Sequence, residues 1–241
     1  MTSASDDMDQ TGKKHKGQTA ADVVSEAPIS FDLSDAVVGV TDGSSPEAES
    51  IGALRTHLVA QHIQDGRRAL AICAPSAGSG CSFVAVNLAV ALSQGGVRTL
   101  LIDADMRSPE IHHMIVPSRR MPGLVQCLGD DAVPFGDAIM ENVLPSLSII
   151  YSGGYAENAQ ELLAGPRFAT QINLCMREYD VTIVDTPPAN ISADARRIAS
   201  IVHYALVVAR KDSTFVSDIK TLIDDLKSDR AHIVGTVLNA A

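Results

Sequence analysis

The chain has 241 residues, of which 46% are hydrophobic and 20% charged, and it carries a formal net charge of −10 and no Trp. This length suits one domain or a domain with a tail, and the acidic balance disfavours nonspecific nucleic-acid binding, which needs positive charge. No apolar stretch is long enough to span a bilayer, no secretory signal is visible, and the four Cys lack close-pair spacing, so we expect a cytoplasmic protein without a membrane span, zinc knuckle or disulfide framework.

The first 45 residues differ in composition from the rest of the chain. They are rich in Ser, Thr, Asp and Gly, with little periodicity before residues 31–40. Such a segment buries too little apolar surface to offset the entropy lost on ordering. We therefore predict a disordered acidic leader over residues 1–45 and one domain over residues 46–241. The apolar run at residues 36–40 leaves open that part of the leader docks on a partner or on the domain.

From residue 45 onward the pattern alternates between helices and strands. Ser45 is placed to cap a helix that starts at Pro46 and runs to residue 64, where Gly66 follows. Short apolar runs that indicate buried strands alternate with helical segments of about 10–15 residues, which is typical of a mostly parallel sheet with helices on both faces. The fold class predicted is therefore three-layer α/β. Strands are expected at residues 68–74, 99–103, 147–151, 180–185, 204–209 and 231–239, and helices at 82–94, 159–178, 192–200 and 214–228, with short helices and loops over 109–142.

A loop rich in Gly and Ser joins the first strand to the next helix, where α/β sheets bind phosphate through backbone N–H groups. It reads Ser76-Ala-Gly-Ser-Gly-Cys-Ser82. Compared with the phosphate-loop motif G-x-x-x-x-G-K-[ST], Gly80 and Ser82 occupy specified positions, and Gly78 lies in the variable stretch between the two motif glycines. Cys81 stands where the motif has Lys, and Pro75 stands where it has its first Gly. Taken alone, the loop is a weak signal, because such turns are common.

Three aspartates follow buried strands and strengthen that signal. Asp103 ends the strand at residues 99–103, Asp105 follows it by two residues, and Asp185 ends the strand at residues 180–185. Ligands of open α/β sheets bind outside the carboxyl ends of the strands. Carboxylates there can hold Mg²⁺ and its waters beside a phosphate loop, although an Asp after a strand often only caps the next helix.

These motifs resemble the bacterial tyrosine kinase (BY-kinase) domain of capsule and exopolysaccharide synthesis, a branch of the MinD/ParA-like P-loop ATPases. The resemblance covers about residues 46–241. Its most specific strings are Leu-Leu-Ile-Asp-Ala-Asp-Met-Arg-Ser-Pro at 100–109 and Tyr-Asp-Val-Thr-Ile-Val-Asp-Thr-Pro-Pro at 179–188. Further matches lie at residues 123–128, 161–168, 192–194 and 235–239.

The resemblance implies roles for individual residues. It implies ATP or ADP with Mg²⁺ as cofactor, with Ser82, Asp103 and Asp185 at the metal and Asp105 assisting the acceptor hydroxyl. Nucleotide binding would involve Gly78, Ser79, Gly80, Cys81 and Ser82 in the loop, and Asn239 would approach the base. The helix before the first strand would contribute Glu49 and Arg55 to an interface with a neighbouring copy.

Three departures from the family pattern weaken the expectation of kinase activity. Cys81 replaces the Lys that neutralises phosphate charge; Gly52 replaces one Arg of the family's E-x-x-R-x-x-R string; and the printed chain has four Tyr and no Tyr-rich tail. We therefore expect a degenerate BY-kinase-like protein with weak or absent ATP turnover. It would act in exopolysaccharide synthesis as an assembly or regulatory partner of a membrane polysaccharide co-polymerase, whose cytoplasmic segment would recruit it to the membrane.

Two alternatives remain open at the level of sequence. One is an active tyrosine kinase in which another cation, such as Arg55 of a neighbour, replaces the missing Lys. The other is a MinD/ParA-type positioning ATPase, which would need a basic face or a C-terminal amphipathic helix. Cys81 could also be a redox switch, since helix N-termini lower thiol pKa values, but a small residue filling a vacated Lys position is the simpler interpretation.

Overall fold

The computed structural model describes residues 28–129 and 133–240 of the chain. Within them lies a seven-stranded sheet with strand order β5-β6-β3-β7-β2-β8-β9, which confirms the predicted mostly parallel α/β architecture. Only the pair β5–β6 at one edge is antiparallel. The strands are β2 (Ala69–Cys73), β3 (Thr99–Asp103), β5 (Met140–Leu144), β6 (Leu147–Ile150), β7 (Val181–Asp185), β8 (Tyr204–Arg210) and β9 (His232–Asn239).

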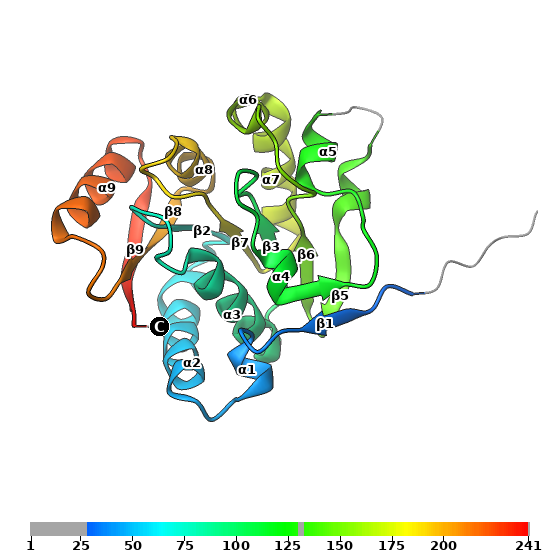
Figure 1. Cartoon of the computed structure of the whole chain (residues 1–241), viewed down its shortest axis with the longest axis horizontal. Coiled ribbons are helices and arrows are strands. Elements are labelled where there is room, and N and C mark those ends of the chain that lie inside the picture. Colours follow the sequence, from blue (N-terminus) through cyan, green and yellow to red (C-terminus); the bar gives the residue numbers. More distant parts are fainter. Residues whose placement is uncertain (1–27, 130–132, 241) are drawn as a thin grey trace, which may run out of the picture.

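Helices pack on both faces of this sheet (Figure 1). The helices α2 (Pro46–Leu58) and α3 (Cys81–Gln94) lie on one side, and α7 (Pro166–Glu178), α8 (Asp194–Val202) and α9 (Val216–Ser228) lie on the other. Two apolar clusters fill the two interfaces. The remaining short helices are α1 (Val38–Thr41), α4 (Ile111–Met114), α5 (Leu124–Gly129) and α6 (Ala159–Ala164), with a π-helical turn η1 (Val59–Ile63) and a 3-10 turn η2 (Phe135–Ala138).

The central strands and α3 explain why the sheet forms where the sequence predicts it. Every residue of β2, β3 and β7 is buried, as expected for parallel strands covered on both faces. Helix α3 is buried from residue 84 to residue 93, so its apolar residues surround it instead of forming one stripe. These elements fix the carboxyl ends of β2, β3 and β7 beside one another. No helix among the described residues is long and apolar enough to cross a membrane.

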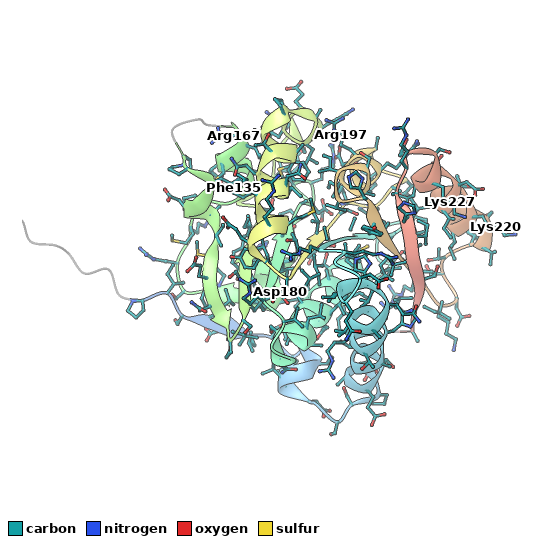
Figure 2. The ribbon with its side chains drawn as sticks, turned by 180° about the vertical axis from the view of Figure 1, so that it is seen from behind. Phe135, Arg167, Asp180, Arg197, Lys220 and Lys227 are labelled. Carbon is teal, nitrogen blue, oxygen red and sulfur yellow. The ribbon has the colours of Figure 1, made fainter. Side chains whose placement is uncertain are left out.

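Helix boundaries follow local chemistry. The Ser45 side chain accepts a hydrogen bond from the N–H of Ala48 at 3.1 Å, which confirms the predicted cap of α2. The single helix predicted over residues 159–178 is divided into α6 and α7 at Gly165, where the backbone is extended and Pro166 starts the second helix. Arg197 of α8 donates to the carbonyls of Leu163 and Ala164 at the end of α6, and Figure 2 shows its position near that end.

The predicted disorder of the leader is wrong for residues 28–45. Strand β1 (Phe31–Leu33) pairs antiparallel with β4 (Ile115–Pro117), and Val37 is fully buried. The Asn87 side chain of α3 accepts from the N–H of Val38 at 2.9 Å and donates to the carbonyl of Ala36 at 2.8 Å. We name residues 28–45 the N-terminal strap. Its few apolar residues find partners only in the folded domain, which local composition does not reveal. Residues 1–27, the rest of the predicted leader, lie outside the described residues.

Candidate functional site

The conformation of the Gly-rich loop between β2 and α3 depends on two glycines with left-handed backbone and on side chains from the ends of β8 and β9. Gly78 and Gly80 have φ values of +72° and +87°, which residues with a side chain rarely adopt. A Cβ atom at Gly80 would collide with the side-chain amide of Asn239. That amide donates to the carbonyl of Ser79 at 3.1 Å, and Arg210 donates to the carbonyl of Gly78 at 3.1 Å. The ends of β8 and β9 therefore fix the shape of the loop.

Two of the three predicted aspartates are direct neighbours across the sheet. Asp103 and Asp185 are register partners at the ends of β3 and β7, and both are fully buried. Asp103 accepts hydrogen bonds from the N–H groups of Asp105 at 3.2 Å and Ile111 at 3.4 Å. Neither carboxylate oxygen of Asp185 has a hydrogen-bond partner among the described residues. Buried polar atoms are seldom left unpaired, so the unpaired carboxylate of Asp185 fits a site that receives a cation.

The electrostatics of this pair are unfavourable without a cation. Burial and the neighbouring carboxylates Asp185 and Asp105 raise the pKa of Asp103 well above its usual range. Burial also raises the pKa of Asp185 to about 7; the Ser82 hydroxyl, which is close to the carboxylate but forms no hydrogen bond of good geometry with it, partly opposes the rise. Two nearby carboxyl groups out of water disfavour double ionisation. A divalent cation would remove that penalty by pairing with both.

Asp105 lies in the loop after β3, next to that pair. Its Oδ1 atom accepts from the N–H groups of Arg107 at 3.1 Å and Ser108 at 2.9 Å, which fixes the side chain within a tight turn. It is 7% exposed and lines the cavity described below. Asp105 therefore borders the cavity, and its role toward an acceptor hydroxyl stays a prediction.

Cys81 is the first residue of α3 and is half-buried. Its thiol donates a weak hydrogen bond to the carbonyl of Ile72, with the sulfur 3.6 Å from the oxygen. Burial and the nearby Asp185 raise the pKa of this thiol well above its usual range. The group is therefore neutral at physiological pH and supplies no charge to a phosphate. A redox switch based on a reactive thiolate is disfavoured for the same reason.

A cavity of about 450 Å³ opens beside the loop, within the range of small-molecule sites. Its walls include residues 76–83 of the loop and α3, Asp105, Thr186 after β7, and Ala36 of the N-terminal strap. Glu110 also lines the cavity, and nothing in the sequence spacing marks it as a site residue. Arg210, which donates to the carbonyl of Gly78, is not among the predicted site residues either, although a polar residue at the end of a buried strand is a usable signal.

The donors present fit a magnesium nucleotide. Among the described residues no three His, Cys, Asp or Glu side chains gather into a metal-binding cluster. Mg²⁺ usually takes one or two carboxylates, keeps several waters and binds substrate phosphates, so a full protein cage is not required. Ser82, Asp103 and Asp185 would hold the ion, and the open loop would receive the phosphates. These roles, like the contact of Asn239 with the base, stay predictions.

The two residues predicted at an interface lie on α2, away from this cavity. Glu49 is exposed, whereas Arg55 donates to the carbonyl of Ala91 in α3 at 3.4 Å. A Cβ atom added at Gly52 would meet no atom within 4 Å, so α2 has room for the missing Arg of the family string. The structure holds one copy of the chain, and the interface stays a prediction.

Comparison with known proteins relates this site to P-loop proteins. A ParA family model, described as NUBPL iron-transfer P-loop NTPase, matches residues 66–241. The chain is 30% identical over 237 residues to the putative tyrosine-protein kinase EpsB of Ralstonia nicotianae, covering 95% of this chain and 31% of that protein. It is 30% identical over 193 residues to the putative tyrosine-protein kinase CapB of Staphylococcus aureus, covering 80% and 83%. The chain thus spans about a third of the length of EpsB, but most of CapB.

Solved structures give the same result. The kinase domain of the Escherichia coli tyrosine kinase ETK superposes with a TM-score of 0.78 at 26% identity, covering 85% of this chain and 80% of that one. The BceF tyrosine kinase domain superposes with a TM-score of 0.75 at 29% identity, covering 85% and 81%. The cell division ATPase MinD of Pyrococcus furiosus gives 0.61 at 22% identity, covering 72% of each chain, which shows a shared fold alone.

Proposed function

This chain belongs to the ParA family of P-loop NTPases, and from that premise we propose that it is a degenerate BY-kinase-like protein that binds a magnesium nucleotide weakly. It is related to the bacterial tyrosine kinases of capsule and exopolysaccharide synthesis. We propose that it acts there as an assembly or regulatory partner of a membrane polysaccharide co-polymerase. In this role it is a cytoplasmic protein that the partner's cytoplasmic segment recruits to the membrane.

The observation that carries this proposal is Cys81 at the start of α3. The loop keeps its left-handed glycines, and β3 and β7 keep their aspartates, which supports the proposal of a phosphate-binding loop beside metal donors. The position that normally supplies a cation holds a neutral thiol bonded to Ile72. A charge-assisted hydrogen bond is worth about 1.5–3 kcal/mol, so its loss weakens binding without removing the site. Loss of one such electrostatic group can also cost about 10²–10³ in rate.

Phosphate transfer with the partner present tests the proposal. Purified protein is mixed with the cytoplasmic segment of the co-polymerase and radiolabelled Mg-ATP, with Asp103→Ala as the matched control. We expect the segment to co-purify with the chain and to receive no more label than in the control reaction. Rapid labelling of a Tyr on the segment would overturn the regulatory role.

An active tyrosine kinase is the second candidate, and one observation favours it. The cavity has a positively charged side chain other than the missing Lys, because Arg107 lines it. Labelling of the partner above the Asp103→Ala control, lost again in Arg107→Gln, would establish this candidate. In that case Cys81 would mark a kinase that uses a different cation, and the acceptor Tyr would belong to the partner.

A further inference from the structure

Arg107 is the one Lys, Arg or His among the described residues that line the cavity. The other charged groups of the lining are the carboxylates of Asp105 and Glu110, and Cys81 is neutral. A nucleotide carries several negative charges in its phosphates. A lining of this kind would repel it unless a bound metal and Arg107 supplied positive charge. The contacts of the Arg107 guanidinium decide whether it can supply that charge.

Two sets of contacts fix Arg107 in place. Its backbone N–H donates to Oδ1 of Asp105, so Arg107 is held within the tight turn that follows β3. Its Nε atom donates to Oδ2 of Asp194 at 3.0 Å. Asp194 lies in the first turn of α8, its side chain is 3% exposed, and Ser192 donates to the same oxygen at 2.9 Å. A buried and separately bonded carboxylate thus orients the guanidinium.

The rest of the guanidinium is not used by the contact with Asp194, and the Arg107 side chain borders two cavities: the one beside the loop and a second one that Glu157 and Glu161 also line. Its two terminal amino groups form no hydrogen bond or ion pair with the described residues, and the Arg107 side chain is 27% exposed. Arg stays charged at all relevant pH values and presents a planar fork that matches a phosphate. The contact with Asp194 uses only one of its donors.

The position of Arg107 selects one phosphate over the others. In P-loop proteins the metal bridges the phosphates at the terminal end of the nucleotide. The metal donors Asp103 and Asp185 lie at the ends of β3 and β7, and Arg107 follows β3 by four residues. Asn239 and Arg210, in contrast, hold the loop from β8 and β9 on the other side of β2. Arg107 therefore lies on the same side of β2 as the proposed metal donors, which is where a metal-bound terminal phosphate would be expected.

We propose that Arg107, oriented by Asp194, binds the terminal phosphate of the nucleotide and compensates in part for the positive charge that Cys81 lacks. This inference rests on the proposed binding of a magnesium nucleotide. It makes Arg107 a residue that distinguishes ATP from ADP. A purely structural role, in which the Arg107–Asp194 pair only ties the loop after β3 to α8, would affect both nucleotides equally.

Calorimetric titration with Mg-ATP and Mg-ADP separates the two roles. Arg107→Gln is compared with the wild type and with the control variant Arg98→Gln. Arg98 pairs with Asp180 at the amino-terminal ends of β3 and β7, opposite to the cavity. Figure 2 labels Asp180. We expect Arg107→Gln to weaken Mg-ATP binding about 10- to 100-fold and to leave Mg-ADP binding within about threefold. Arg107→Lys, which keeps the charge but loses the fork, should lie between them, and Arg98→Gln should match the wild type.

The same titrations in a Cys81→Lys background keep the two proposals apart. If the wild type binds neither nucleotide but Cys81→Lys binds both, the proposed nucleotide binding of this chain fails, and Arg107 is judged in that background. Equal losses for Mg-ATP and Mg-ADP, or no loss for either, would overturn the assignment of Arg107. Thermal unfolding of each variant verifies that it is folded; if Arg107→Gln is not, Arg107→Lys gives the same comparison.

Discussion

At the ends of two adjacent strands, Asp103 and Asp185 place carboxyl groups side by side in the core, and the structure gives Asp185 no hydrogen-bond partner among its described residues. Such a pair is tolerated if it shares protons or receives a cation. The usual phosphate-loop Lys would contribute positive charge nearby, and here Cys81 does not. The chemistry of the site therefore depends on Mg²⁺ more strongly than in a P-loop with its Lys.

This pair predicts how stability depends on pH. The pKa of Asp185 is about 7 in the folded protein and near 4 when unfolded, so the folded state binds more protons between these values. The stability contributed by this proton is present at low pH and is lost as pH rises through 7. Without Mg²⁺, we expect the melting temperature of the wild type to fall between pH 5 and pH 8 by at least about 3 °C more than that of Asp185→Asn, where about 1 kcal/mol corresponds to about 2–4 °C.

Thermal unfolding monitored by circular dichroism provides this measurement. Added Mg²⁺ at pH 8 should raise the melting temperature of the wild type and leave Asp185→Asn nearly unchanged. Identical pH profiles for the two proteins would show that Asp185 does not titrate in the predicted range.

Individual site residues differ in how far the sequence foretold them. Asp103 and Asp185 were found because buried parallel strands bring their carboxyl ends together, and that rule holds here. Glu110 and the partnership of Arg107 with Asp194 were not foreseen, because the latter joins residues 87 positions apart. Contacts of that kind follow from the packing of loops, on which sequence spacing is silent.

Among the elements, those with a local signal were predicted and those that depend on distant partners were not. Ser45 and Pro46 mark the start of α2 by chemistry within four residues. Strand β1 instead forms because β4, more than 80 residues away, offers it an edge. Local composition therefore predicts a disordered leader where the structure has the N-terminal strap. It matters for the site because Ala36 of the strap lines the cavity.

Asn87 is the residue that fastens the strap to α3, and its replacement tests that link. Asn87→Ala leaves the Val38 N–H and the Ala36 carbonyl without their partner, at a cost of about 1–3 kcal/mol. We expect hydrogen exchange at the Val38 amide to accelerate at least tenfold more than in the core of β3. Ser93→Ala is the matched control, because Ser93 is also buried in α3 but bonds only to Val90. Equal acceleration in both variants would mean that the strap is held by other contacts.

Across the whole molecule, the α/β class and the alternation of strands and helices could be predicted, whereas the order of the strands could not. Periodicity indicates which segments are buried, but not which strands are neighbours. The antiparallel strand β5 at the edge begins within residues 109–142, where only short helices and loops are expected from the sequence. Its exposed Glu141 and Asn142 obscure the strand pattern.

We propose that the chain keeps most of a phosphate cradle and that the charge missing at Cys81 limits its affinity for nucleotide. Calorimetric titration of Mg-ATP into the wild type and Cys81→Lys tests it most directly, with Cys127→Ala as a control for a buried thiol elsewhere. We predict weak binding by the wild type and an affinity at least tenfold higher for Cys81→Lys, as a restored charge-assisted contact requires. Equal affinities for the wild type and Cys81→Lys would contradict the account.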